Sequence, residues 1–462
     1  MRASPPRHLL AALSIVSVIG CSAATIRSPA PTVGPSAAPA TPPASAGART
    51  SPPGSEPVSA GVPKAWLLVG RVGEPDLHLV MAATGEIDQM AVPDGTPATD
   101  WWRVVSANVV GGQTVVRDDI VQPGLGGAEL RVAGQWRLPT VGLDPVPTGR
   151  SLDGSTIVLI DRAYDPAAAV SRFAVLQHFS LGAIQTAGDA PLRLARTIEL
   201  PGAFEFDTLS PDGAILYVVE HLDGAAGGHY QVRAVDVATG VMRAGVIVDK
   251  THPDESMAGS PIAQVRRPNG LVLTLYRGPE HPFIHALNST EAWAVCIDLP
   301  AASSADAAAS LDWGLAPGSG DNSVFAVNAS LGLAVEIDPT QLAVLRSASI
   351  ATTASAPILL AKFGHSPVGP VGRRLVPSPD GKLLFAAGAT GITVIKTADL
   401  SVARRDLAGS TVDALGIAPD GRTLFVLVRD GGRIVAIDTA TGRRLGTVPG
   451  EGYDRLLAVT PW

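Results

Sequence analysis

A short phrase that recurs along this 462-residue chain constrains its fold more than any other feature. It reads Pro211-Asp212-Gly213, Pro379-Asp380-Gly381 and Pro419-Asp420-Gly421, and an apolar run follows each copy. Because proline presets φ and Asp-Gly favours a tight turn, each copy predicts a turn between two strands. Turns that recur with apolar runs between them predict one structural unit built several times along the chain.

A second phrase follows two of these turns, as Asp-Val-Ala-Thr-Gly at 236–240 and Asp-Thr-Ala-Thr-Gly at 438–442. The last unit shows the whole pattern, with strands predicted at Leu415–Ala418, Thr423–Val428, Arg433–Asp438 and Arg444–Val448. Four antiparallel strands in about forty residues make one blade of a β-propeller. The sequence therefore predicts an all-β fold, a single propeller of four-stranded antiparallel blades.

The same template predicts eight units between residues 64 and 462, and seven blades with longer loops is the alternative. Besides the last unit, they lie near 64–94, 97–141, 144–201, 204–250, 256–300, 307–350 and 368–408. Three of the turns have decayed, at 152–154, 268–270 and 318–321. We expect the strands at 66–70 and 456–460 to pair and close the ring, because closure removes exposed sheet edges. A frayed C-terminal strand is the alternative.

Charge and composition narrow the possible partners. The formal net charge is −7 and no run of basic residues occurs, which argues against a nucleic-acid partner. Four arginine pairs, at 266–267, 373–374, 404–405 and 443–444, are expected at solvated strand or turn ends. With only two cysteines, Cys21 and Cys296, the chain has no disulfide framework.

The first twenty residues are typical of an export signal. Arg2 and Arg7 precede an apolar stretch from Leu9 to Ile19, which is too short to span a membrane. The tetrad Val-Ile-Gly-Cys that ends at Cys21 resembles the lipobox of bacterial lipoproteins, which implies that residues 1–20 are removed and that Cys21 is lipidated. An ordinary signal peptide with an incidental cysteine is the alternative.

Residues 21–63 predict a disordered tether between the lipidated cysteine and the propeller. Ten of the 42 residues from 22 to 63 are proline, and large apolar side chains are rare. Such a segment cannot bury enough surface to offset its ordering entropy. The predicted organisation is a signal peptide at 1–20, a linker at 21–63 and a propeller at 64–462.

The repeat resembles the bacterial YVTN-type and TolB-like propeller repeats, which are distant relatives of WD-repeat proteins. The resemblance rests on the Pro-Asp-Gly turn, the apolar strand after it, and the strand that ends in Asp-x-x-Thr-Gly. It covers most of 204–452 and is weak over 64–203. It implies a rigid, often secreted propeller and implies no activity.

The richest charged loop lies between the fourth and fifth units, where an inter-blade connection is expected to run towards the central channel. Its candidate ligand residues are Asp249, Lys250, His252, Asp254 and Glu255. They could grip a polar ligand or a cation, although the oxygen spacing of a calcium loop is absent and a solvated connecting loop is the alternative.

No other pattern predicts chemistry. His281 and His285 are four residues apart, but Pro282 and the apolar run after it predict a strand, on which two such residues lie about 13 Å apart. Cys296 sits between apolar neighbours and is expected to be an inert core residue. The repeated turns join strands within a blade and are not expected to line the channel. We therefore predict no catalytic residue, no metal site and no cofactor.

The functional prediction is a surface-tethered lipoprotein, a monomer whose propeller serves as a binding or scaffold module outside the cytoplasm. Its partners would be the membrane, through the lipid, and an envelope protein or a small polar ligand. Non-enzymatic function is favoured. The alternative is an exported, lactonase-like propeller hydrolase that uses the acidic loop at 249–255, because related propellers include such enzymes.

Overall fold

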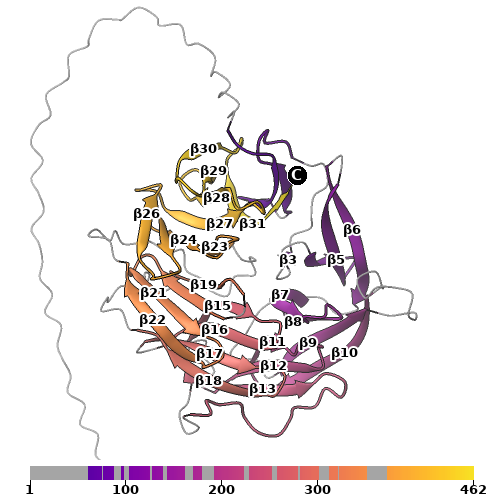
Figure 1. The fold of residues 1–462 in the computed structure, drawn as a ribbon. Helices are drawn as coiled ribbons and strands as arrows, with labels where there is room; N and C mark the ends of the chain where they lie inside the picture. Colours follow the sequence, from indigo (N-terminus) through magenta and orange to yellow (C-terminus); the bar gives the residue numbers. More distant parts are fainter. Residues whose placement is uncertain are drawn as a thin grey trace, which may run out of the picture. The chain divides into compact units, whose positions relative to one another are not determined.

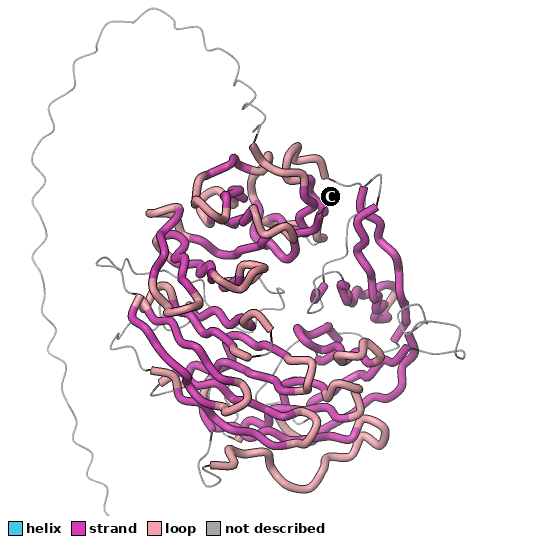
Figure 2. Tube along the Cα trace, in the orientation of Figure 1, coloured by secondary structure: helices cyan, strands magenta, loops and turns pink. Residues whose placement is uncertain are grey.

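A computed structural model describes residues 61–74, 76–87, 95–97, 103–124, 127–138, 143–161, 170–178, 192–222, 228–251, 257–278, 281–300, 312–320, 322–350 and 372–461. Residues Pro57–Trp462 make up one compact unit of the chain. Its described part consists of strands joined by turns and loops, with no helix (Figure 2), and hence no helix that could cross a membrane. The predicted signal peptide and Cys21 lie outside the described residues.

Eight antiparallel sheets follow one another around a ring (Figure 1). The first four are β2 His78–Met81, β1 Ala65–Arg71 and β31 Tyr453–Pro461; β3 Gly95–Pro97, β4 Arg103–Val110, β5 Gln113–Gly124 and β6 Gly127–Leu138; β7 Leu143–Arg150, β8 Thr156–Asp161, β9 Val170–His178 and β10 Leu192–Pro201; and β11 Phe204–Leu209, β12 Ile215–His221, β13 His229–Asp236 and β14 Met257–Ala258.

The other four sheets complete the ring. They are β15 Ser260–Arg266, β16 Leu271–Arg277, β17 Pro282–Asn288 and β18 Trp293–Asp298; β19 Trp313–Pro317, β20 Val324–Asn328, β21 Leu333–Asp338 and β22 Ala343–Ser349; β23 Leu375–Pro377, β24 Leu383–Gly388, β25 Gly391–Lys396 and β26 Val402–Asp406; and β27 Val412–Ile417, β28 Thr423–Val428, β29 Arg433–Asp438 and β30 Arg444–Thr447. The predicted eight-bladed β-propeller is confirmed.

The ring closes by pairing the two ends of the propeller. β1 pairs with β31 from Ala65 opposite Pro461 to Arg71 opposite Tyr453. β31 is the innermost strand of this sheet and contacts β27, the innermost strand of the sheet before it. This sheet has three regular strands, and a bridge between Val80 and Ile87 marks a rudimentary fourth. Closure by the C-terminal strand is therefore confirmed.

The hydrophobic core is divided among the interfaces between consecutive sheets. β28 shows how: Phe425 and Leu427 pack towards the closing sheet, whereas Leu424 and Val426 pack towards β24 and β25. Because both faces of such a strand are buried, its sequence is a continuous apolar run without alternation.

The Pro-Asp-Gly phrase forms the turn between the first two strands of a sheet. Gly213 has a φ of 67° and donates its N–H to the carbonyl of Ser210, while Ser210 Oγ donates to Asp212 Oδ1 at 2.6 Å. Successive turns also touch: a Cβ on Gly270 would lie 3.0 Å from Cγ of Pro211. We call the end of the ring that carries the turns at 151–155, 210–214, 267–270, 378–382 and 418–422 the turn face.

Backbone carbonyls of the second phrase accept hydrogen bonds from an arginine of the preceding sheet. Arg404 on β26 donates to the carbonyls of Thr439 and Ala440, and its Nε is 3.0 Å from Asp406 Oδ2. Arg346 of β22 donates hydrogen bonds to the carbonyls of Thr397 and Ala398 in the same way. These arginines therefore join consecutive sheets, and the expectation of solvated arginine pairs is wrong for Arg404, because the guanidinium binds backbone carbonyls of the next sheet.

Candidate functional site

The most strongly perturbed titratable groups lie between the β11–β14 sheet and the β15–β18 sheet, which are neighbours in the ring (Figure 1). We call this set the polar row. It runs from the innermost strands to the outermost strand and comprises Asp207, Gln264, Thr274, His285, Cys296 and Asp249. Perturbed groups of this kind mark candidate functional sites, and ion-pair networks in a core can perturb groups as well.

Asp207 begins the row on the innermost strand β11. It occupies a β-bulge between Phe206 and Thr208, which redirects its side chain relative to the regular alternation. The residue is 7% exposed, and burial raises the pKa of its carboxyl group to about 7. Gln264 of β15 donates to the backbone carbonyl of Asp207 at 3.3 Å. Among the described residues, the carboxylate oxygen Oδ2 has no hydrogen-bond partner.

The row continues across the β15–β18 sheet by cross-strand pairing. Gln264 Nε2 donates to Thr274 Oγ1 at 3.0 Å, Thr274 is opposite His285, and His285 is opposite Cys296. His285 is 1% exposed, and burial lowers the pKa of its imidazole to about 4 although Asp249 acts in the opposite direction. The imidazole is therefore neutral at physiological pH.

Asp249 and Lys250 end the row at the outer side of the sheet, and the expectation that this part of the loop runs to the channel is wrong. Asp249 pairs with Ala294 of β18, and its carboxylate accepts hydrogen bonds from Cys296 N and from the N–H and hydroxyl of Thr251. Lys250 Nζ lies 3.6 Å from the ring centroid of Trp293. The backbone of Asp249 and Lys250 bonds to the outer edge of β18 at Ala294, and this pairing holds the loop against that strand.

The other candidate loop residues, His252, Asp254 and Glu255, lie outside the described residues, so a ligand role for this loop stays a prediction. His281 was considered together with His285 as a zinc ligand. It precedes β17, its side chain is 37% exposed, and its Nε2 lies 2.9 Å from Asp298 Oδ1. Within the described ranges, no group of three or more His, Cys, Asp and Glu side chains could hold a metal ion.

A second buried charge cluster lies near the turn face. Asp118 Oδ2 of β5 is 2.8 Å from Arg150 Nη1 and 3.0 Å from His178 Nε2, so the carboxylate joins two sheets. Arg266 of β15 donates to the carbonyl of Arg150 across the intervening sheet, and burial lowers the pKa of Arg266 to about 10. Arg267 is buried as well. The expectation of a solvated pair is wrong here too, because both side chains are buried and Arg266 binds a backbone carbonyl of another sheet.

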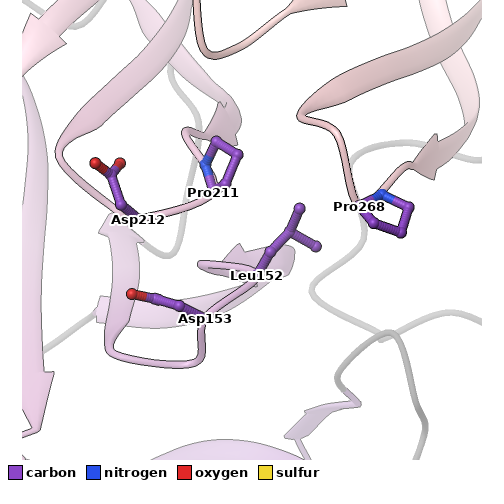
Figure 3. A pocket seen from close by; sticks show the side chains of 5 residues that line it. All are labelled: Leu152, Asp153, Pro211, Asp212 and Pro268. Carbon is purple, nitrogen blue, oxygen red and sulfur yellow. The ribbon is translucent and has the colours of Figure 1, made fainter.

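The turn face carries an open hollow of about 520 Å³ (Figure 3). Three successive turns line it with Leu152, Asp153, Pro211, Asp212 and Pro268. In Figure 3 the Leu152 side chain points between the two prolines, whereas the two carboxylates point away from them. The sequence did not predict this hollow, which forms because the turns of neighbouring blades pack side by side.

The carboxylates of both acids in the hollow accept hydrogen bonds from residues of their own turns. Asp153 Oδ1 accepts from Ser151 Oγ at 2.6 Å and from the N–H of Ser155 at 2.9 Å. Asp212 accepts from Ser210, and this hydrogen bond is the main cause of the lowered pKa of its carboxyl group. What the hollow offers a ligand is therefore mostly an apolar surface of leucine and proline.

Several solved structures are similar to this chain in fold. Citrobacter koseri AztD matches with a TM-score of 0.50 at 12% identity, over 85% of this chain and 97% of that chain. The dihydro-heme d1 dehydrogenase NirN, solved in complex with DHE, matches with a TM-score of 0.51 at 13% identity, over 84% of this chain and 74% of that chain. No protein-family model and no curated protein matches the sequence. These likenesses show the fold alone, and with the eight sheets they define an eight-bladed β-propeller protein.

Proposed function

We propose that this chain is a lipid-anchored propeller of the YVTN-type or TolB-like kind that works outside the cytoplasm as a binding or scaffold module. The hollow on the turn face is the observation that carries the binding role. An open apolar surface with occupied carboxylates suits a bound side chain better than it suits acid–base chemistry, which needs a carboxyl group able to exchange a proton with a substrate.

The partner that fits this hollow is an envelope protein that inserts an apolar side chain between Pro211 and Pro268. Leu152, 38% exposed, is the residue whose replacement tests this most directly. We expect Leu152→Glu to abolish capture of the partner from solubilised envelopes. Leu345→Glu is the matched control, because Leu345 on β22 is 60% exposed and lies outside the hollow. Equal capture by both variants would exclude the hollow as the binding surface.

The anchor is tested separately at Cys21. Expressed in a bacterium that processes lipoproteins, the chain should incorporate an alkyne-labelled fatty acid and sediment with membranes, and Cys21→Ser should lose the label and the sedimentation. Mass spectrometry of the mature N-terminus should find an acylated cysteine. An unmodified N-terminus at another position would refute the lipoprotein proposal and leave the binding role to its own test.

The hydrolase alternative depends on the loop at 249–255. Asp249 already accepts hydrogen bonds from Thr251 and Cys296, which favours a structural role for this carboxylate. If Asp249→Asn lowered the stability of the propeller but left binding of the envelope partner unchanged, that structural role would be supported. Hydrolysis of a lactone or ester that this variant loses while it remains folded would instead support the alternative.

A further inference from the structure

The imidazole of His285 is the buried polar group that the rest of the structure explains least. It is 1% exposed, and among the described residues neither ring nitrogen has a hydrogen-bond partner. Buried polar groups normally have such a partner, since desolvation without compensation is costly. Tyr276 provides only an edge contact, with ring centroids 6.3 Å apart. A buried ring nitrogen without a protein partner is available to bind an ion or a water molecule.

A thiol lies beside this imidazole. His285 and Cys296 are directly opposite in the antiparallel pairing of β17 and β18, so their side chains leave the same face of the sheet with Cβ atoms about 5 Å apart. That face packs against Tyr230 of the neighbouring sheet, which stacks on Tyr276 with ring centroids 5.1 Å apart. Cys296 is partly exposed and lies on the outermost strand, so the site can be reached from the rim of the ring.

The charge balance selects the kind of ion. A neutral imidazole and one thiolate neutralise a single positive charge, whereas a divalent ion would leave a net charge in a buried site, which is costly. The described residues offer no third His, Cys, Asp or Glu to complete a zinc site. Thiolate ligands favour soft ions such as Cu(I). Two donors on opposite strands can bind such an ion from two sides.

We propose that His285 and Cys296 bind one soft monovalent cation of the Cu(I) class between an imidazole nitrogen and the thiolate sulfur. Binding releases the thiol proton to solvent and changes no oxidation state. Asp249, which accepts a hydrogen bond from Cys296 N, fixes the backbone that carries the thiol. This site does not depend on the hollow of the turn face or on the lipid anchor.

The test uses the full chain with Cys21→Ser, so that Cys296 is the only thiol. Anaerobic titration with Cu(I) against a chromogenic chelator should show one equivalent bound. Cys296→Ser and His285→Gln should each weaken binding by more than about tenfold, because even residues that only support a ligand contribute that much. His281→Gln is the matched control and should bind as the parent chain does, since this histidine is exposed and precedes β17.

Absence of stoichiometric binding, or equal affinity in the His285→Gln variant, would overturn the proposal. If a variant fails to fold, X-ray absorption of the Cu(I) complex of the parent chain answers the same question. One sulfur and one nitrogen donor are expected. A copper environment without nitrogen, or one without sulfur, would overturn the site.

Discussion

Asp207 and His285 should impose opposite pH dependences on the stability of the propeller. Native Asp207, with a pKa of about 7, keeps a proton that the unfolded chain releases above about pH 4, so its contribution to stability falls as pH rises through this window. Native His285, with a pKa of about 4, lacks a proton that the unfolded chain holds below about pH 6.5, so its contribution rises with pH. Between these limits the two effects nearly cancel.

The magnitudes follow from the width of each window. One pKa unit corresponds to about 1.4 kcal/mol, so Asp207 costs up to about 4 kcal/mol above pH 7. His285 costs up to about 3 kcal/mol near pH 4 by the same reasoning. Asp207→Asn should therefore gain stability relative to the parent chain as pH rises, by about 1.4 kcal/mol per unit, and His285→Gln should show the opposite slope.

Urea unfolding from about pH 4.5 to 7.5, with a copper chelator present, measures both slopes. The difference between variant and parent is the quantity to plot, because all other titrating groups cancel and a lost packing contact shifts only the level. Flat differences for Asp207→Asn and His285→Gln would refute the reasoning, and so would slopes of the same sign.

Three further predictions concern contacts between neighbouring blades and hydrogen bonds within the turns, each measured by chemical denaturation. Arg404→Lys should cost about 1–3 kcal/mol, because lysine keeps the charge but cannot bind two backbone carbonyls of the next sheet. Gly421→Ala should cost more than Gly111→Ala: both positions have positive φ, but only at Gly421 would a Cβ meet the proline ring of the preceding turn, at 2.9 Å. Ser210→Ala should lower the free energy of unfolding by about 1 kcal/mol, because it removes two hydrogen bonds. Ala418→Ser, which places a serine at the equivalent position of the last turn, should raise it by a similar amount. A cost for Ala418→Ser would show that the turns are not equivalent.

The fold could be predicted from the sequence because its information is local. A Pro-Asp-Gly turn and the strands on each side of it lie within one blade, so the pattern of one clear unit, with strands from Leu415 to Val448, also identifies decayed turns such as 152–154. Closure by β31 could also be predicted, because the first unit lacked an innermost strand and the last was followed by a spare one.

The polar row could not be predicted, because it depends on how two neighbouring sheets face one another. Local sequence patterns predict turns and strands, but they do not predict which side chains of two sheets meet. Asp207 acquires its environment from a bulge in β11 and from Gln264 of the next sheet. The one available signal was an acidic residue within an apolar strand run. The prediction for Arg404 was wrong for the same reason. Its partners are backbone carbonyls of another blade, and every residue has such a carbonyl, so no sequence pattern identifies them.

The strand that closes the ring, β31, is synthesised after every other strand of the propeller that the structure describes. The partners of β1 lie about 400 positions later in the sequence. Bringing together segments so distant costs only about 2 kcal/mol more in chain entropy than closing one blade. Its effect is kinetic, since non-local pairing is slow. A chain interrupted before Tyr453 leaves one edge of β1 open. The ring can therefore close only after the residues of β31 have been synthesised, so its closure follows the formation of every other strand pair in sequence order.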